Sequence, residues 1–206
     1  MITKISDSGI DHLTKLEGFK GRVYKDSAGY PTIGVGHLLK KEEITLRKVF
    51  IGGVSYDFHE GLTGKEIKDL LRQDLVGMEE CVANTIKQPL NQHQFDALVI
   101  FCFNIGTVAF QRSTLVRNLN ACDYEDVPTQ LRRWNKAGGK TIQGLINRRE
   151  AEIKIWNGEP EEEVRTAATV DWMLKRHGLK MCVQDPTGEH MHVKYDPSIA
   201  QFKVEK

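Results

Sequence analysis

The chain has little that marks a metalloprotein, a redox protein or a protein stapled by disulfides. Its 206 residues include four cysteines, and none of them forms a Cys-x-x-Cys pair. Such pairs are typical of zinc and thiol-redox sites, so we expect no metal ion and no cofactor. Free thiols are the default in a protein made in a reducing compartment. We therefore expect free thiols at the four positions, which are Cys81, Cys102, Cys122 and Cys182.

The chain also lacks long hydrophobic runs and a strong excess of one charge. No apolar stretch approaches the 18 residues that indicate a transmembrane helix. The first residues, MITKIS, lack the apolar region and the small-residue cleavage site of a secretory signal. The net charge is only +1, so no overall field draws the chain to a nucleic acid. We expect synthesis in the cytoplasm, no stable membrane insertion and no nucleic-acid partner.

One segment carries most of the functional information. Residues 16–37 read LEGFKGRVYKDSAGYPTIGVGH and contain two carboxylates and a hydroxyl, at Glu17, Asp26 and Thr32. Glu17 ends a helical pattern, whereas Asp26 and Thr32 flank a turn that contains glycine. Two carboxyl groups facing each other across a cleft, with a hydroxyl to help hold a water, are the parts needed to hydrolyse a glycosidic bond.

The segment resembles the phage-type lysozymes, a family of muramidases classed as glycoside hydrolase family 24. The spacing of Glu17, Asp26 and Thr32 matches the family without a gap. Further matching blocks follow in order along the chain, and they lie at 89–98, 103–106, 113–115 and 138–152. A motif supported by its surroundings is far more specific than a pair of carboxylates alone.

The resemblance covers about residues 3–158 and implies a fold. We expect an α+β protein, mostly α, with a small β-hairpin lobe and a larger helical lobe. A capping box at 63–66 predicts the long helix that joins the two lobes in this family. We divide the chain into a catalytic domain at 1–158 and an extension of unknown role at 159–206. The extension reads as an acidic linker, a helix at 164–177 and a hairpin around 185–188.

The resemblance also assigns catalytic roles. Glu17 is the candidate general acid, and we expect its carboxyl to be partly desolvated beside Phe19. Asp26 and Thr32 are candidates to hold a water on the opposite face of the sugar. Inversion follows if the two carboxyl groups lie about 6.5–9.5 Å apart. The alternatives stay open: Glu17 as an ion-pair partner of Arg148 or Arg149, Asp26 as a turn residue and Thr32 as a strand former.

Other residues receive supporting roles. We expect His37 to be structural, paired with Asp74 of the long helix, rather than a catalytic base. Arg148 is expected near Glu17. Candidates for substrate binding on the helical side of the cleft are Phe103, Asn104 and Trp134, because amide groups and aromatic faces suit sugars. For the two aromatic residues, packing in the core is an equally good interpretation.

The extension contains two histidines, His190 and His192, that would share a face of a strand near Cys182. No fourth ligand is evident, so we interpret them as ordinary surface histidines.

The function implied by the resemblance is that of an endolysin. Such an enzyme cuts the β-1,4 bond between N-acetylmuramic acid and N-acetylglucosamine in bacterial peptidoglycan. We expect a monomer, made in the host cytoplasm and released by a holin to act on the wall from the periplasm. Two alternatives remain: a lytic transglycosylase, and a virion-associated or non-catalytic wall-binding module.

Overall fold

The structure is a computed structural model whose chain divides into two compact units, Met1–Glu159 and Pro160–Lys206. The residues that the structure describes are 2–26, 28–159, 181–184, 190–196 and 201–205. The first unit contains the segment with Glu17, Asp26 and Thr32.

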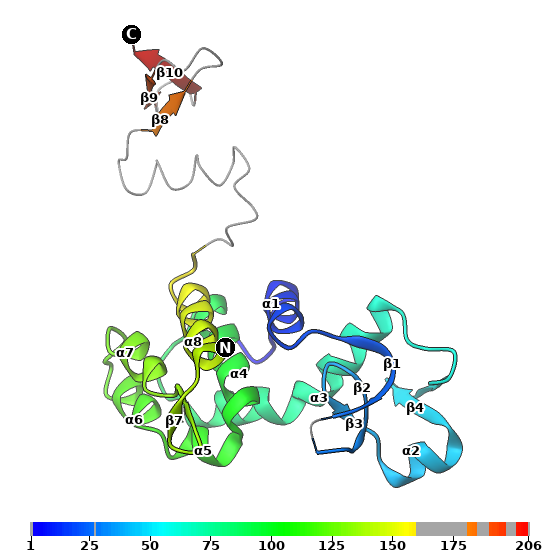
Figure 1. Ribbon diagram of the computed structural model, residues 1–206. Coiled ribbons are helices and arrows are strands. Elements are labelled where there is room, and N and C mark those ends of the chain that lie inside the picture. The colour runs from blue at the N-terminus through cyan, green and yellow to red at the C-terminus, as the bar shows by residue number, and fades with distance from the viewer. Residues whose placement is uncertain (1, 27, 160–180, 185–189, 197–200, 206) are drawn as a thin grey trace. The chain divides into compact units, whose positions relative to one another are not determined.

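Helices make up most of the first unit (Figure 1). In chain order they are α1 (Asp7–Glu17), α2 (Lys41–Leu46), α3 (Gly64–Thr85), α4 (Gln92–Ile105), α5 (Thr107–Gln111), α6 (Thr114–Asn120), α7 (Val127–Arg132) and α8 (Gln143–Trp156). Its strands are short, and they are β1 (Lys20–Lys25), β2 (Pro31–Gly34), β3 (His37–Leu38), β4 (Lys48–Ile51), β5 (Val54–Asp57), β6 (Lys136–Ala137) and β7 (Lys140–Thr141).

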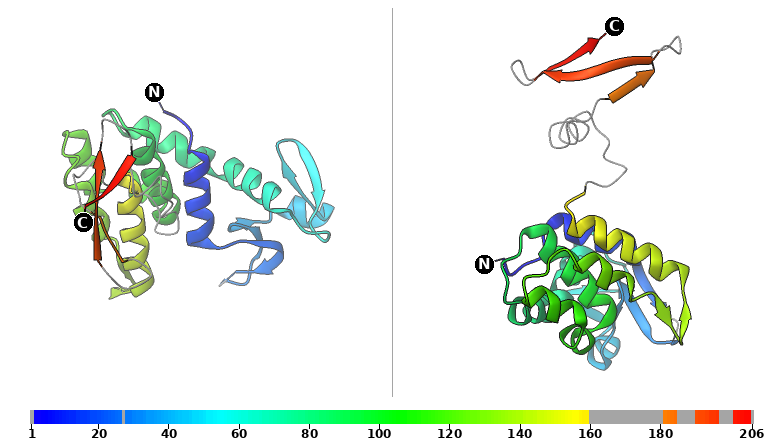
Figure 2. Two further views of the ribbon diagram at one scale, coloured as in Figure 1. Left: turned by 90° about the horizontal axis from the view of Figure 1, so that it is seen from above. Right: turned by 90° about the vertical axis from the view of Figure 1, so that its left-hand side faces the viewer.

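The strands between α1 and α3 form the small lobe of the first unit. An antiparallel sheet has the order β1-β2-β3, and Tyr24 of β1 pairs with Thr32 of β2. Strands β4 and β5 form a second hairpin, whose turn uses left-handed backbone at Gly52 and Gly53. Figure 2 shows this lobe on the side of the unit opposite α6 and α7.

The long helix α3 connects the small lobe to the helical lobe. A capping box starts it: the Thr63 hydroxyl accepts from Glu66 N, and the Glu66 carboxylate accepts from Thr63 N. Along its length α3 contacts β2, β3 and β4 of the small lobe and α1, α4 and α5 of the helical lobe. The two lobes therefore share one rigid element, as Figure 1 shows.

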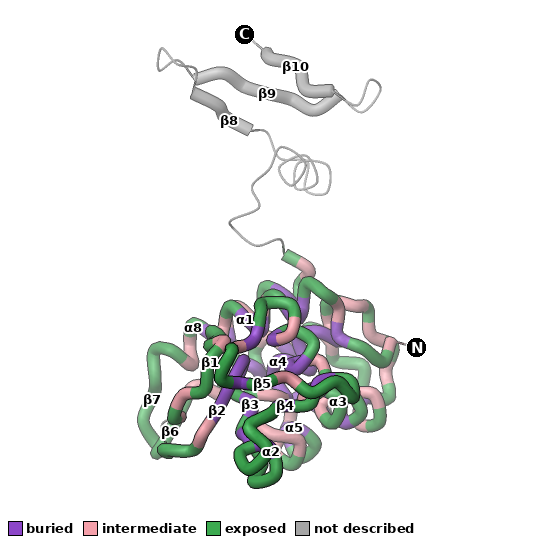
Figure 3. Tube along the Cα trace, turned by 90° about the vertical axis from the view of Figure 1, so that its right-hand side faces the viewer, coloured by how far each residue is buried: buried purple, intermediate pink, exposed green. Residues whose placement is uncertain are grey.

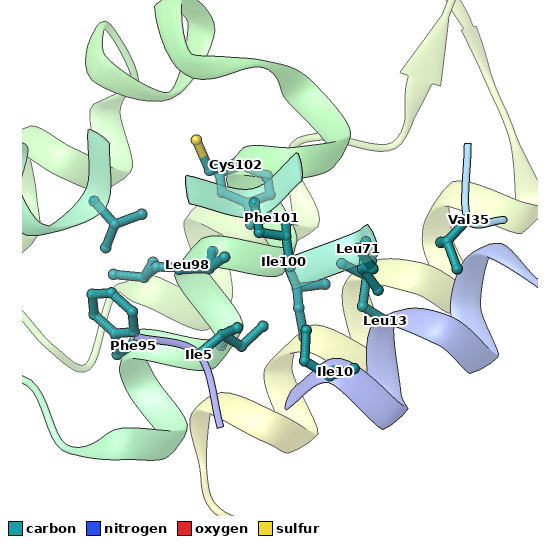
Figure 4. Close-up of a cluster of buried hydrophobic side chains, with 14 of the residues drawn as sticks. Ile5, Ile10, Leu13, Val35, Leu71, Phe95, Leu98, Ile100, Phe101 and Cys102 are labelled. Carbon is teal, nitrogen blue, oxygen red and sulfur yellow. The ribbon is translucent and has the colours of Figure 1, made fainter. Parts of the chain in front are cut away.

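Helix α4 lies at the centre of the helical lobe. Every residue from Phe95 to Cys102 is buried, and the helix packs against α1, α3, α5 and α8. A helix that is apolar on all sides needs such neighbours on all sides. The buried residues, which are coloured purple in Figure 3, include much of α4 and parts of the helices around it. Figure 4 shows Ile10 and Leu13 of α1 gathered with Ile100 of α4.

The predicted fold class, an α+β protein that is mostly α with two lobes joined by a long helix, is confirmed. Several short elements were not expected from the sequence, namely α2, α5, β3, β4, β6 and β7. Helix α2 has only six residues. It is followed by Arg47, which caps the helix and adopts a left-handed conformation with φ of 56°. So short a helix, less than two turns, cannot produce a clear apolar period.

The second unit contains a three-stranded antiparallel sheet. Its strands are β8 (Met181–Gln184), β9 (His190–Asp196) and β10 (Gln201–Glu205), in the order β10-β9-β8. The hairpin expected near 185–188 corresponds to β8 and β9, whereas β10 was not expected. The helix expected at 164–177 lies outside the described residues, as do the side chains of Cys182, His190 and His192. Across the described part of the chain, every helix is too short or too polar to cross a membrane.

Candidate active site

Glu17 is the last residue of α1, and local sequence explains why the helix stops there. The helix starts at Ser6, whose hydroxyl accepts a hydrogen bond from Gly9 N. It ends at Gly18, which has a φ of 69° and donates its backbone N–H to Thr14 O at 2.9 Å. That backbone conformation favours glycine, so the end of α1 is well defined.

The Glu17 carboxylate accepts a hydrogen bond from an arginine near the C-terminal end of the first unit. Arg148 Nη1 on α8 donates to Glu17 Oε1 at 2.6 Å. The Glu17 side chain is 29% exposed and the Arg148 side chain only 10%. Phe19, which we expect beside this carboxyl, is 58% exposed. Arg148 from α8 orients one oxygen of Glu17 and leaves part of the carboxyl open to solvent.

Asp26 follows β1 and organises the turn to β2. Its Oδ1 atom accepts hydrogen bonds from Ala28 N at 2.9 Å and Tyr30 N at 2.8 Å. Its backbone N–H donates to Tyr30 O at 2.9 Å, which closes the hairpin. An aspartate that bonds backbone two and four residues ahead is a typical turn former. The same bonds fix the direction in which its carboxylate points.

Thr32 lies on β2 beside this turn. It pairs with Tyr24, and Asp26 is two residues beyond Tyr24 on the opposing strand. Directly paired residues and residues two apart share a sheet face, so Thr32 and Asp26 project to the same side. The Thr32 hydroxyl donates to Tyr30 O at 3.1 Å, and the residue is 2% exposed. The hydroxyl oxygen thus keeps lone pairs that can accept a hydrogen bond.

Behind Glu17 lies a buried cluster that the sequence did not reveal. Glu152 Oε1 on α8 accepts from Arg148 Nε at 3.2 Å and from Arg149 Nη2 at 2.9 Å. Burial raises the pKa of Glu152 to about 7, against the attraction of Arg149 and Arg148, which lowers it. Burial likewise lowers the pKa of Arg149. A glutamate four residues after an arginine was the signal for this ion pair.

The three proposed substrate-binding residues differ in their surroundings. Asn104 is exposed near the end of α4, and its Oδ1 accepts from Arg149 Nη2 at 2.6 Å. Phe103 is half-buried and packs against the core. Trp134 is also half-buried, with its ring edge-on to Phe101 at 5.6 Å. Asn104 is therefore connected to the cluster behind Glu17, while the two aromatic residues make core contacts.

His37 is the first residue of β3, and its imidazole lies between two carboxylates. Its Nδ1 lies 3.0 Å from the Asp74 carboxylate on α3, and its Nε2 lies 3.3 Å from Glu43 Oε2 on α2. Burial lowers the pKa of His37, but Asp74 and then Glu43 outweigh it, so the pKa is raised overall. Glu43 was not expected here, because it lies on the short helix that the sequence did not predict.

Comparison with known proteins agrees with this architecture. The phage lysozyme family model matches residues 14–152. The endolysin of Salmonella phage P22 is 38% identical over 153 residues, which are 74% of this chain and 97% of that protein. The endolysin of Bacillus phage PZA is 34% identical over 179 residues, which are 86% of this chain but 64% of that longer protein.

Solved structures point the same way. A crystal structure of a P22 lysozyme mutant superposes with a TM-score of 0.65 at 35% sequence identity, covering 76% of this chain and 99% of the other. The two-lobed fold is therefore that of a lysozyme. The chain belongs to the phage lysozyme family.

Proposed function

We propose that this chain is an endolysin that hydrolyses the β-1,4 bond between N-acetylmuramic acid and N-acetylglucosamine in peptidoglycan. One observation carries the proposal: Glu17, Asp26 and Thr32 all lie within the residues 14–152 that match the phage lysozyme family. The Salmonella phage P22 endolysin, which this chain covers almost completely, supports the same substrate class. The wall polymer is thus the proposed partner, bound by a monomer.

In the proposed mechanism Glu17 is the general acid. Arg148 binds its Oε1 atom at 2.6 Å, so Oε2 is the oxygen that would carry the proton to the glycosidic oxygen. Proton donation to the leaving group is what breaks an otherwise stable acetal. The partial exposure of Glu17 fits a group that must meet a bound polymer.

Asp26 and Thr32 would hold the attacking water. The Thr32 hydroxyl already donates its hydrogen to Tyr30 O, so it would accept one hydrogen of the water. Asp26 Oδ1 is occupied by two backbone donors, and Oδ2 would accept the other hydrogen. The lone pair of the water then faces the anomeric carbon from the side opposite Glu17. As this water attacks and the bond to the leaving oxygen breaks, Asp26 would take up the proton that the water loses, and the anomeric configuration is inverted.

A lytic transglycosylase is the nearest alternative reaction. That chemistry closes a 1,6-anhydro ring and uses no water, so it has no need for a water-holding pair such as Asp26 and Thr32. Mass spectrometry of products from purified peptidoglycan separates the two: hydrolysis yields free reducing ends, and transglycosylation yields anhydro sugars. A non-catalytic wall-binding module would yield neither product.

The test of the acid is Glu17→Gln, which removes the transferable proton with almost no change in shape. Activity on purified peptidoglycan should fall by at least about 10²–10⁴-fold, the usual worth of general acid catalysis. Glu80→Gln, at an exposed position on α3, is the matched control and should keep wild-type activity. A Glu17→Gln protein that retains more than about a tenth of wild-type turnover would refute the assignment.

The cellular route follows from the same proposal. The enzyme would be made in the host cytoplasm and would reach the wall from the periplasmic side after release by a holin. The unit Pro160–Lys206 carries none of the proposed catalytic groups. We propose that it is an appended element for packing or wall targeting.

A further inference from the structure

One buried carboxylate, that of Glu152, is connected to both sides of the proposed site. Glu152 is 0% exposed in its side chain, and Arg149 beside it is 1% exposed. Both are on α8, which packs against α4 and α7. The Glu152 Oε1 atom accepts from Arg148 and from Arg149 at once. One oxygen thus fixes two guanidinium groups on successive residues of the helix.

Each guanidinium reaches a different part of the proposed cleft. Arg148 Nη1 continues to Glu17 at the end of α1, and Arg149 Nη2 continues to Asn104 near the end of α4. The Arg149 guanidinium also lies over the Phe101 ring, with its carbon 4.9 Å from the ring centre. The planar fork of an arginine is suited to hold two acceptors in a fixed geometry.

We propose that Glu152 is a positioning residue. Its carboxylate orients Arg148 against Glu17 and Arg149 against Asn104. The acid and the amide of the cleft are thereby held in a fixed position relative to each other. Glu152 touches neither substrate nor reacting atom in this scheme. The proposal rests on the assignment of Glu17 as the acid.

Stability alone does not account for the cluster. Four of its buried polar atoms have no hydrogen-bond partner among the described residues: Arg148 Nη2, Arg149 Nε, Arg149 Nη1 and Glu152 Oε2. A buried polar atom without a partner destabilises the fold. Buried ion pairs are often no more stabilising than apolar residues of the same volume. A cluster with this cost is better explained by the orientation that it imposes on Glu17 and Asn104.

The charged groups around Glu152 connect it to Glu17 through Arg148. Within the described residues, the charged groups that act on Glu152 are Arg148 and Arg149 on its own helix and Glu17 on α1. On the neighbouring α7, Arg132 is bonded to Glu150 instead. Arg148 is therefore shared between two carboxylates. Without the Glu152 carboxylate, Arg148 would keep Glu17 as its carboxylate partner but would lose the bond that fixes its own position.

The experiment compares Glu152→Gln, Glu152→Asp and a control in the full chain. The control is Glu150→Gln, because the Glu150 side chain lies on the same helix and is 44% exposed. Initial rates on purified peptidoglycan give kcat and KM as a function of pH, with thermal unfolding measured in parallel. Glu152→Gln should lower kcat about ten- to a hundredfold, the size of effect expected from a small misplacement of a catalytic group. KM should stay near its wild-type value, because Glu152 does not touch the substrate in this scheme.

Glu152→Asp tests the reach of the side chain. It keeps a carboxyl group but is one methylene shorter, so it cannot hold both arginines. We expect kcat to fall in this variant also, with KM near its wild-type value. If Glu152→Gln is too unstable to assay, this variant still tests the proposal. Glu150→Gln should match the wild type in both kcat and KM.

The outcomes distinguish this inference from the proposed function. A folded Glu152 variant with wild-type kcat and pH profile overturns the positioning role, even if its melting temperature falls. If Glu17→Gln is as active as wild type, the assignment of the acid has failed instead. If Glu17→Gln is inactive while both Glu152 variants behave like wild type, the proposed function stands and the role of Glu152 does not.

Discussion

His37 Nδ1 lies 3.0 Å from both carboxylate oxygens of Asp74. This contact ties β3 in the small lobe to α3, the helix that both lobes share. The imidazole is 5% exposed, and its other nitrogen faces Glu43. Two carboxylates around one buried imidazole favour the charged form, so the pKa of His37 is raised despite burial, which lowers it.

This pair predicts a pH-dependent contribution to stability. A histidine whose pKa is higher in the folded protein stabilises the fold fully below its unfolded value of about 6.5, and the contribution is lost as pH rises through the folded value. Asp74→Asn should lower the free energy of unfolding by about 1.5–3 kcal/mol near pH 6, the worth of a hydrogen bond to a charged group. The difference from wild type should shrink at alkaline pH.

Urea unfolding at a series of pH values from mildly acidic to alkaline measures this difference. Asp69→Asn is a suitable control, since Asp69 is an exposed aspartate on the same helix. Its effect should be small and independent of pH. A loss for Asp74→Asn that is constant across the range, or greatest at alkaline pH, would contradict the assigned ion pair.

A second prediction concerns the stereochemistry of the product. If Asp26 and Thr32 hold the water on the face opposite Glu17, the first sugar released from a β bond is the α-anomer. Proton NMR during the first part of the reaction resolves the two anomers before they equilibrate. Early appearance of the β-anomer would instead indicate a covalent intermediate, or attack from the same face as the leaving group.

A third prediction concerns the division of the chain. The groups assigned to catalysis all belong to the unit Met1–Glu159. A protein ending at residue 158 should therefore still cleave soluble peptidoglycan chains, while it loses stability or affinity for insoluble walls. Turnover, thermal unfolding and co-sedimentation with purified walls measure these properties. Loss of cleavage with an unchanged melting temperature would show that the second unit supplies part of the site.

Elements with clear local signals could be predicted from the sequence. Helix α1 has a capping serine at Ser6 and a terminal glycine at Gly18, and α3 has the capping box of Thr63 and Glu66. The turn at Asp26 was readable because aspartate and glycine favour turns. These signals lie within a few residues of the feature they specify, so no tertiary information was needed.

The parts of the site that depend on burial could not be predicted. Glu152 looks like one more charged residue on a charged helix, and only the packing of α8 shows that its side chain is fully buried. Glu43 was missed for a related reason, because its short helix is stabilised by contacts with β4 and by the bond to His37. Long-range burial, rather than local pattern, decides which carboxylates become partners of a cation.

The hydrogen bond between Glu17 and Arg148 joins residues separated by 131 positions. Glu17 belongs to α1, whereas Arg148 belongs to α8, near the end of the first unit. A growing chain that has not yet reached α8 lacks the arginine that orients the acid. Synthesis therefore imposes an order on the formation of the site. The proposed site is completed only when nearly all of the first unit has left the ribosome.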